Sequence, residues 1–266
     1  MICVLGDAHL DLVVSVSGQL AADTDTPAST RLAVGGQGAN VAAWVVSLGG
    51  RSRLITARGT DLAAALVAGE LTDRGVEVVG PVLEGHTGVI VSLSDGGRHR
   101  SMLTDRGVGP RLSADAFDEA WLDDCSWLHL PAYSLTETPV SGTALAAAAA
   151  ARLRSARISV DLSSTAAISG YGVGPFRELL AGLRPDVVFG NQAETELVGK
   201  LDGVTVVSKH GADGVVIDER HYPAARTEPA DATGAGDAFA AGYLVGGVSL
   251  GLSAAARAVA TIGAMP

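Results

Sequence analysis

The chain has 266 residues, of which 47% are hydrophobic, 18% charged and 4% aromatic. This length and composition predict a single large α/β domain over residues 1–266, with a core built mainly from Ala, Val and Leu. The formal net charge of -10 disfavours nonspecific binding to nucleic acid or to anionic membranes. Cys3 and Cys125 match no zinc-site spacing. No secretory pattern or membrane-spanning apolar run is evident, so we expect a soluble, cytoplasmic protein.

Short apolar runs alternate with helical stretches along most of the chain. Buried parallel strands are expected at residues 2–5, 127–130, 158–162, 187–189 and 204–207. Helices are expected at about residues 62–72, 139–154 and 253–262. This alternation predicts βαβ units and a parallel sheet, and ligands bind beyond the carboxyl ends of such strands. The polar residues at or near these ends are Asp7, Tyr133, Asp161, Asn191 and Lys209.

A glycine-rich turn, Gly35-Gly36-Gln37-Gly38, opens a helix that is expected to run to about Leu48. Small residues at a helix N-terminus let a ligand approach the backbone closely. The turn is not a dinucleotide-binding fingerprint, because Val41 stands in place of the third glycine. From the residues alone, an ordinary loop-to-helix transition is the simpler interpretation.

Asn191 and Glu194 stand three residues apart at the start of a predicted helix. Their oxygen atoms suit a hydrated Mg²⁺ ion, and a helix-capping box explains the same spacing without any chemistry. Lys209 ends the next strand, where it either reaches a phosphate or lies exposed to solvent. Arg106 follows a strand predicted over residues 98–103, and it either meets an anionic ligand group or belongs to a solvated sheet face.

The stretch Asp231-Ala232-Thr233-Gly234-Ala235-Gly236-Asp237-Ala238-Phe239 places three small residues between two acids, directly before a helix. The small residues and the unpaired N–H groups of the helix start form a seat for an anion, most often phosphate. Asp237 would repel such an anion, but it suits a catalyst in which a carboxylate takes a proton from a hydroxyl during phosphoryl transfer. An acidic N-cap is the structural alternative.

Residues 231–239 closely resemble the C-terminal signature of the ribokinase (PfkB) family of carbohydrate kinases, D-T-x-G-A-G-D-x-F, with Ala232 as the departure. Gly35–Ala42 resembles the family's N-terminal signature, G-G-x-x-x-N-x-A. The family's N-x-x-E element and G-x-x-G turn match residues 191–194 and 211–214, in the family's order.

The resemblance implies an α/β fold with a ribokinase-like three-layer α/β/α arrangement, a mostly parallel central sheet and a small β lid. The lid is expected from two inserted segments, at about residues 10–34 and 87–105, with a tight turn at Gly96-Gly97. The implied reaction is phosphoryl transfer from ATP, with Mg²⁺, to a hydroxymethyl group of a sugar or sugar-like substrate.

The family's functional positions carry over to the matching residues of this chain. The resemblance makes Asp237 the general base and the turn of Gly234, Ala235 and Gly236 the anion hole. The implied substrate-binding positions are Asp11, Gly35, Gly36 and Asn40, with Asp7 a weaker match than Asp11. Arg106 is a further candidate for substrate binding, from its residue type and position alone. The implied cofactor-binding positions are Asn191, Lys209, Gly211 and Gly214. The implied metal positions are Glu194 for Mg²⁺, through water, and Asp231 and Thr233 for the K⁺ that some members bind.

Two other functions are compatible with these motifs. A nucleoside kinase of the same family would stack its base on lid aromatics, but no Phe, Tyr or Trp precedes Trp44, which favours a sugar. A non-catalytic sugar-binding relative is the other alternative, and it fits poorly with the intact Asp237 and Glu194. The implied partners are therefore the sugar and ATP, together with a homodimer formed through the lid.

Overall fold

The structure, a computed structural model, describes residues 1–94 and 100–266. The strands of its main sheet are β1 Ile2–Leu5, β4 Ser52–Ile55, β5 Glu77–Val79, β8 Trp127–Pro131, β9 Arg157–Asp161, β10 Val187–Asn191, β11 Thr205–Lys209, β12 Val215–Ile217 and β13 Arg220–Tyr222. In the described ranges this nine-stranded sheet has the order β13-β12-β11-β10-β9-β8-β1-β4-β5. The strands from β5 to β11 in this order pair in parallel, whereas β12 and β13 pair antiparallel at one edge.

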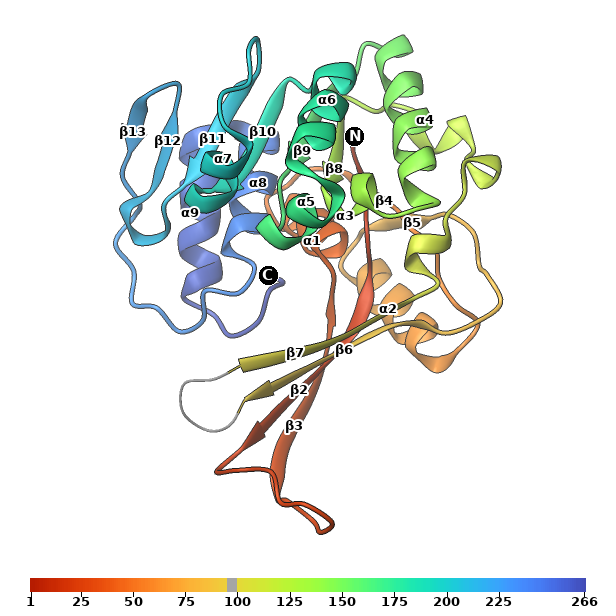
Figure 1. Cartoon of the computed structure of the whole chain (residues 1–266), viewed down its shortest axis with the longest axis vertical. Helices are drawn as coiled ribbons and strands as arrows, with labels where there is room; N and C mark the ends of the chain where they lie inside the picture. The colour runs from red at the N-terminus through yellow and green to blue at the C-terminus, as the bar shows by residue number, and fades with distance from the viewer. Residues whose placement is uncertain (95–99) are drawn as a thin grey trace.

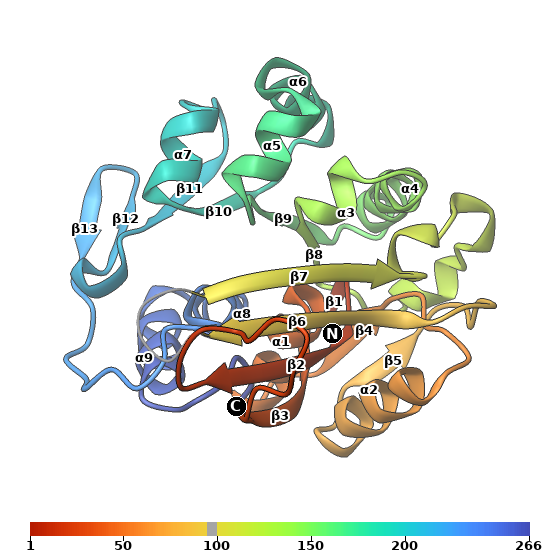
Figure 2. The same ribbon diagram turned by 60° about the horizontal axis from the view of Figure 1, so that its bottom comes forward.

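Helices cover both faces of this sheet. They are α1 Gln37–Ser47, α2 Leu62–Asp73, α3 Tyr133–Thr136, α4 Val140–Leu153, α5 Thr165–Tyr171, α6 Val173–Leu183, α7 Gln192–Val198, α8 Ala235–Gly246 and α9 Val248–Val259. Short 3-10 helices lie at Gly109–Arg111, Ala114–Ala116, Glu119–Leu122 and Gly211–Asp213. Helices α3 to α7 lie on one face, and α1, α2, α8 and α9 lie on the other (Figure 2).

The continuous apolar runs of the strands follow from this double cover. Side chains alternate between the two faces of a strand, so a strand buried on both sides needs apolar residues at every position. In β1, Cys3 and Leu5 pack into the core beneath α4 to α6. Ile2 and Val4 pack into the opposite core, against α1, α8 and α9.

A second, smaller sheet projects from the carboxyl ends of the central strands (Figure 1). It consists of β2 His9–Val16, β3 Ala28–Gly35, β6 Thr87–Ser94 and β7 Arg100–Gly107, in the order β3-β2-β6-β7. These strands coincide with the predicted lid segments, and the α/β fold with its mostly parallel sheet is confirmed. The predicted turn at Gly96-Gly97 lies outside the described residues.

The last helix differs from its prediction. It was expected over residues 253–262, whereas α9 begins at Val248 and ends at Val259. The early start has a local cause: Gly247 has φ 80° and both ends α8 and caps α9. The early end follows because the Val259 carbonyl accepts hydrogen bonds from the N–H groups of Ala230 and Asp231 instead of continuing the helix.

Among the described residues, no helix is both long enough and apolar enough to cross a bilayer.

Candidate active site

Asp237 lies in the first turn of α8, at the carboxyl end of the central sheet. Gly234 caps this helix in a left-handed conformation, with φ 77°. A Cβ atom on Gly234 would lie 2.5 Å from the carbonyl oxygen of Ala264, so the turn needs glycine. Asp237 itself makes no capping hydrogen bond, and the alternative of an acidic N-cap is therefore wrong.

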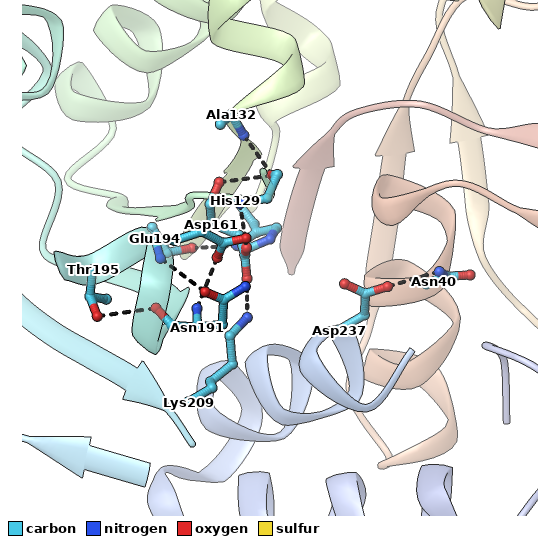
Figure 3. Close-up of polar contacts among 11 residues, drawn as sticks. Asn40, His129, Ala132, Asp161, Asn191, Glu194, Thr195, Lys209 and Asp237 are labelled. Atoms are coloured by element: carbon cyan, nitrogen blue, oxygen red, sulfur yellow. Dashed lines mark hydrogen bonds and ion pairs between the residues drawn. The ribbon is translucent and has the colours of Figure 1, made fainter. Parts of the chain in front are cut away.

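The Asp237 carboxylate is instead directed toward α1. Asn40 donates a hydrogen bond from Nδ2 to Asp237 Oδ2 at 2.8 Å (Figure 3). Burial raises the pKa of Asp237 to about 7, with Asp161 adding to the rise, while Asn40 and Lys209 oppose it. A carboxylate with a pKa near 7 takes up a proton at neutral pH more readily than an ordinary aspartate does.

The glycines of the N-terminal signature bring α1 against the start of the lid. Gly36 has φ 105°, and a Cβ atom on it would lie 2.5 Å from the carbonyl oxygen of Asp7. A Cβ atom on Gly35 would overlap the carboxylate of Asp11. The small residues thus leave room for Asp11 at the N-terminus of α1, where Asn40 is buried.

Three buried oxygen atoms at the N-terminus of α1 have no hydrogen-bond donor among the described residues: Asp11 Oδ1, Gln37 Oε1 and Asn40 Oδ1. His9 Nε2 lies 3.1 Å from Asp11 Oδ1, but this ion-pair contact does not have hydrogen-bond geometry. A buried acceptor without a donor is costly. Three of them at one helix N-terminus therefore favour a ligand that donates several hydrogen bonds.

Arg106, in lid strand β7, contacts residues outside the lid beside a second pocket. Its Nη1 atom lies 3.2 Å from Asp7 Oδ2, and its guanidinium lies over the Tyr133 ring, 4.2 Å from the centroid. The pocket is lined by these three residues together with His9, Glu137 and apolar side chains of β1 and α4. Arg106 is therefore held at the pocket by a carboxylate and an aromatic ring.

Asn191 and Glu194 form a complete capping box at the start of α7. Asn191 Oδ1 accepts from the Glu194 N–H at 2.9 Å, and Glu194 Oε2 accepts from the Asn191 N–H at 2.8 Å. Glu194 is buried, and desolvation followed by the negative charge of Asp161 raises its pKa. The helix-capping alternative for Asn191 and Glu194 is therefore present. The Glu194 carboxylate also lies in the same site as Asp161 (Figure 3).

Lys209 is held inside the site rather than exposed. Its Nζ atom lies 2.7 Å from Asp161 Oδ2, and only 17% of its side chain is accessible. Burial lowers the pKa of Lys209, but the carboxylates of Asp161, Asp237 and Glu194 outweigh burial, so the pKa is raised overall. Nζ also lies 3.1 Å from the position of a Cβ atom on Gly236, which places the ammonium group beside the first turn of α8.

Asp161 and His129 are the polar residues of this site to which the sequence assigned no role. The sequence placed Asp161 at a strand end. A carboxylate in an otherwise apolar strand is the signal that could have marked it as a functional residue. His129 lies on β8 behind it, fully buried, with Nδ1 2.9 Å from Ser159 Oγ. Burial lowers the pKa of His129 to about 4, so the ring is neutral at physiological pH.

The two remaining groups of candidate residues hold loops at the same end of the sheet. Gly211 and Gly214 have φ values of 60° and 98° in the turn after Lys209, and a side chain on Gly214 would overlap the backbone of β13. Asp231 Oδ1 accepts from the N–H and hydroxyl of Thr233, at 2.9 and 2.6 Å. Asp231 Oδ2 accepts from the Gly263 N–H at 3.2 Å. These bonds fix the loop that leads into the glycine turn before α8.

The site fits a nucleotide phosphate with its magnesium ion. The N-terminus of α8, with its glycine turn and adjacent Lys209 ammonium, presents positive potential to an anion. In the described residues, no three His, Cys, Asp or Glu side chains are gathered as a preformed metal site. Mg²⁺ typically uses one or two carboxylates together with waters and substrate phosphates. Glu194, buried at the start of α7, supplies a carboxylate of that kind.

The mostly parallel sheet, the small lid sheet and the two glycine turns at the carboxyl end of the strands are the features of a kinase with the ribokinase-type fold. The chain matches the pfkB family of carbohydrate kinases over residues 1–265. It belongs to this family, and it is a carbohydrate kinase that transfers phosphate to an alcohol group.

Individual relatives span most of the chain. An ATP-dependent ribose-1-phosphate kinase from Halopiger xanaduensis is 30% identical over 262 residues, covering 92% of this chain and 84% of the relative. A fructokinase from Escherichia coli is 30% identical over 276 residues, covering 94% and 85%. The crystal structure of a probable sugar kinase from Rhizobium etli superposes with a TM-score of 0.88, at 21% identity, covering 100% of this chain and 94% of that one.

Proposed function

We propose that this protein transfers the γ-phosphoryl group of ATP to a hydroxymethyl group of an unphosphorylated sugar. The observation that carries the proposal is the position of Asp237. Its carboxylate stands between the acceptor-lined N-terminus of α1, to which Asn40 links it, and the anion-binding turn of α8. A hydroxyl group bound at the first site is thereby adjacent to a phosphate bound at the second.

In the proposed reaction, Asp237 accepts the proton of the sugar hydroxyl as its oxygen forms the new bond to phosphorus. The N–H groups of Gly234, Ala235 and Gly236 donate to the oxygens of the phosphoryl group as charge develops on them. ATP supplies the phosphoryl group and Mg²⁺ neutralises phosphate charge, and Glu194 would hold the ion through water. Asn191, Lys209, Gly211 and Gly214 are proposed to surround the nucleotide.

The charges around the pocket favour a neutral sugar over a sugar phosphate. Arg106 is already paired with Asp7, and His9 lies between Asp7 and Asp11, 3.7 and 3.1 Å from their carboxylates. Glu137 adds a further carboxylate to the pocket lining. Like charges brought together in a binding site cost several kcal/mol. An added phosphate on the substrate would meet these carboxylates, whereas sugar hydroxyls can donate to the unpaired oxygens of Asp11, Gln37 and Asn40.

A nucleoside is the second candidate class, and the lid argues against it. The described lid strands contain no Phe, Tyr or Trp on which a base could stack. The aromatic ring of the neighbouring pocket, Tyr133, is covered by the Arg106 guanidinium. The sugar therefore remains the better fit. A non-catalytic role is disfavoured because Asp237 and its bond to Asn40 are both present.

Three further proposals accompany this function. A homodimer through the lid is supported by exposed apolar side chains on its strands, namely Leu32, Met102 and Leu103. A cytoplasmic location is supported by the two free, buried cysteines and by the need for ATP. A K⁺ ion beside Asp231 and Thr233 is proposed because both residues supply oxygen atoms next to the anion hole.

The test is ADP formation measured with ATP and Mg²⁺ against matched substrates: ribose and fructose, their phosphates, and a set of nucleosides. We expect turnover with at least one free sugar and a kcat/KM for its phosphate that is lower by about a hundredfold or more. Preferred turnover of a nucleoside would support the second candidate. Absence of turnover with every acceptor, in a folded protein that binds ATP, would contradict the proposed function.

A further inference from the structure

We propose that Asp161 is a positioning residue: it holds the Lys209 ammonium group beside Gly236, where it meets the transferred phosphoryl group, and away from the base Asp237. This inference rests on the proposed function, since it assigns a role within the same phosphoryl-transfer site. It concerns a residue to which neither the sequence motifs nor the family signatures gave a role.

The contact between the two residues is short and shielded from solvent. Lys209 Nζ lies 2.7 Å from Asp161 Oδ2, and the Asp161 side chain is 2% exposed. Charge-assisted hydrogen bonds of this length are roughly twice as strong as neutral ones. A buried pair of this kind costs desolvation energy, so it is weak evidence for stability alone and better evidence for a site that needs the charge.

Asp161 is itself fixed by the turn that follows β9. Its Oδ1 atom accepts from the Ser163 N–H at 3.0 Å. The Ser163 hydroxyl donates to the Asp161 carbonyl and accepts from the Ala132 N–H, both at 3.0 Å. Ser163 adopts a left-handed conformation, with φ 61°, to make these contacts. The carboxylate therefore has one oxygen bound to the backbone and the other free to hold the lysine.

The tether matters because the lysine side chain is long and has more than one carboxylate to choose from. Four rotatable bonds let the ammonium group move, and Asp237 and Glu194 both attract it. In the structure Lys209 points toward Asp161, whereas Asp237 points toward Asn40 (Figure 3). An ammonium group paired with Asp237 would stabilise the ionised carboxylate and weaken it as a proton acceptor.

The experiment is a double-mutant cycle with Asp161→Asn, Lys209→Thr and the double variant, measuring kcat and KM for ATP and for the sugar at saturating Mg²⁺. The control is Asp186→Asn. Asp186 also pairs with a basic residue, at 2.8 Å from Arg152 Nη1, but it precedes β10 at the opposite end of the sheet. We expect Lys209→Thr to lower kcat by about a hundredfold and Asp161→Asn by about tenfold, with KM for ATP changed less than threefold. The control should keep wild-type kinetics.

If Asp161 acts through Lys209, the effects are not additive, and the double variant is no slower than Lys209→Thr. Additive losses would overturn the proposal, and so would an Asp161→Asn variant that mainly raises the Mg²⁺ concentration for half-maximal rate, because that marks a metal ligand. Lys209→Thr leaves Asp161 unpaired and can fail to fold. In that case Asp161→Asn is compared with the double variant: the proposal expects the double variant to be about tenfold slower, whereas a loss of about a hundredfold would overturn it, because the lysine would then contribute fully without its tether. An inactive wild-type enzyme would count against the proposed function instead.

Discussion

The N-termini of α1 and α8 meet at the carboxyl end of the sheet, and they are built for opposite hydrogen-bonding partners. The α1 N-terminus presents oxygen atoms, three of which have no donor among the described residues. The α8 N-terminus presents backbone N–H groups and the Lys209 ammonium. An acceptor-lined site suits hydroxyl groups and a donor-lined site suits phosphate.

The contrast shows how two similar glycine-rich turns can serve different substrates. Glycine gives both turns their close backbone approach, with φ 105° at Gly36 and φ 77° at Gly234. In the proposed reaction, the side chains one turn further on separate the two roles: Asn40 on α1 and Asp237 on α8. Their mutual hydrogen bond joins the two helices at these ends. Changing either helix N-terminus, or breaking the bond between them, therefore tests whether the division is real.

The largest effect is expected from Asp237→Asn. The substitution keeps the shape of the side chain and an oxygen that can accept from Asn40, but it removes the carboxylate that we propose as the base. We expect kcat to fall by about 10² to 10⁴, with the protein still folded and still binding ATP. Steady-state kinetics and a thermal melt are the measurements. Turnover within a fewfold of wild type would mean that Asp237 is not the base.

The pH dependence gives the next largest effect. Because the pKa of Asp237 is raised to about 7, the base is ionised above that pH. The kcat/KM for the sugar should fall about tenfold per pH unit below 7 and level off above it.

The raised pKa of Asp237 affects stability in the opposite direction from activity. The folded protein holds this proton more tightly than the unfolded chain, so stability is lost as pH rises from about 4 through 7.

Asp237→Asn provides the matched control for both pH effects. The variant has no carboxylate at this position, so its melting temperature should exceed that of wild type more at pH 8 than at pH 5. If kcat/KM of the wild type does not depend on pH between 5.5 and 7.5, protonation of Asp237 does not control the rate.

The sequence predicted the α8 N-terminus better than the α1 N-terminus, and the reason is physical. Residues 234–239 form the glycine turn and the helix start that were expected from the nine-residue stretch. The fold was equally predictable, because apolar runs buried on both faces have few alternatives. Asp161 and Lys209 are 48 positions apart in the chain. Their pairing depends on the neighbouring register of β9, β10 and β11, which no local pattern contains.

Asn40→Ala should have a smaller effect than loss of the base. It removes the hydrogen bond that lowers the pKa of Asp237 and one of the unpaired acceptors of the α1 N-terminus. We expect kcat to fall by about tenfold, KM for the sugar to rise by a similar factor, and the pH limb to move upward. Gln37→Ala is the control, since it removes an acceptor without touching Asp237. It should raise KM and leave the pH limb in place.

Glu194→Gln separates charge from helix capping. Glutamine can make the same capping box with Asn191, so the melting temperature should change little. Loss of the carboxylate should raise the Mg²⁺ concentration needed for half-maximal rate by several-fold. Glu196→Gln, an exposed position on the same helix, is the control and should change neither quantity. An unaltered Mg²⁺ dependence in Glu194→Gln would assign Glu194 to capping alone.

The smallest expected effect is that of monovalent cations on the α8 N-terminus. A K⁺ ion held by Asp231 and Thr233 oxygens would order the loop before Gly234, so that its N–H groups face the phosphoryl group before it arrives. Such preorganisation acts on the transition state, so K⁺ should raise kcat by a few-fold and lower KM less. The hydrogen bonds that Asp231 accepts from Thr233 and Gly263 already fix part of this loop, which is why the effect should be modest. Assays in K⁺, Na⁺ and a bulky organic cation at one ionic strength decide the matter. Equal rates in all three would show that these hydrogen bonds order the anion hole without an ion.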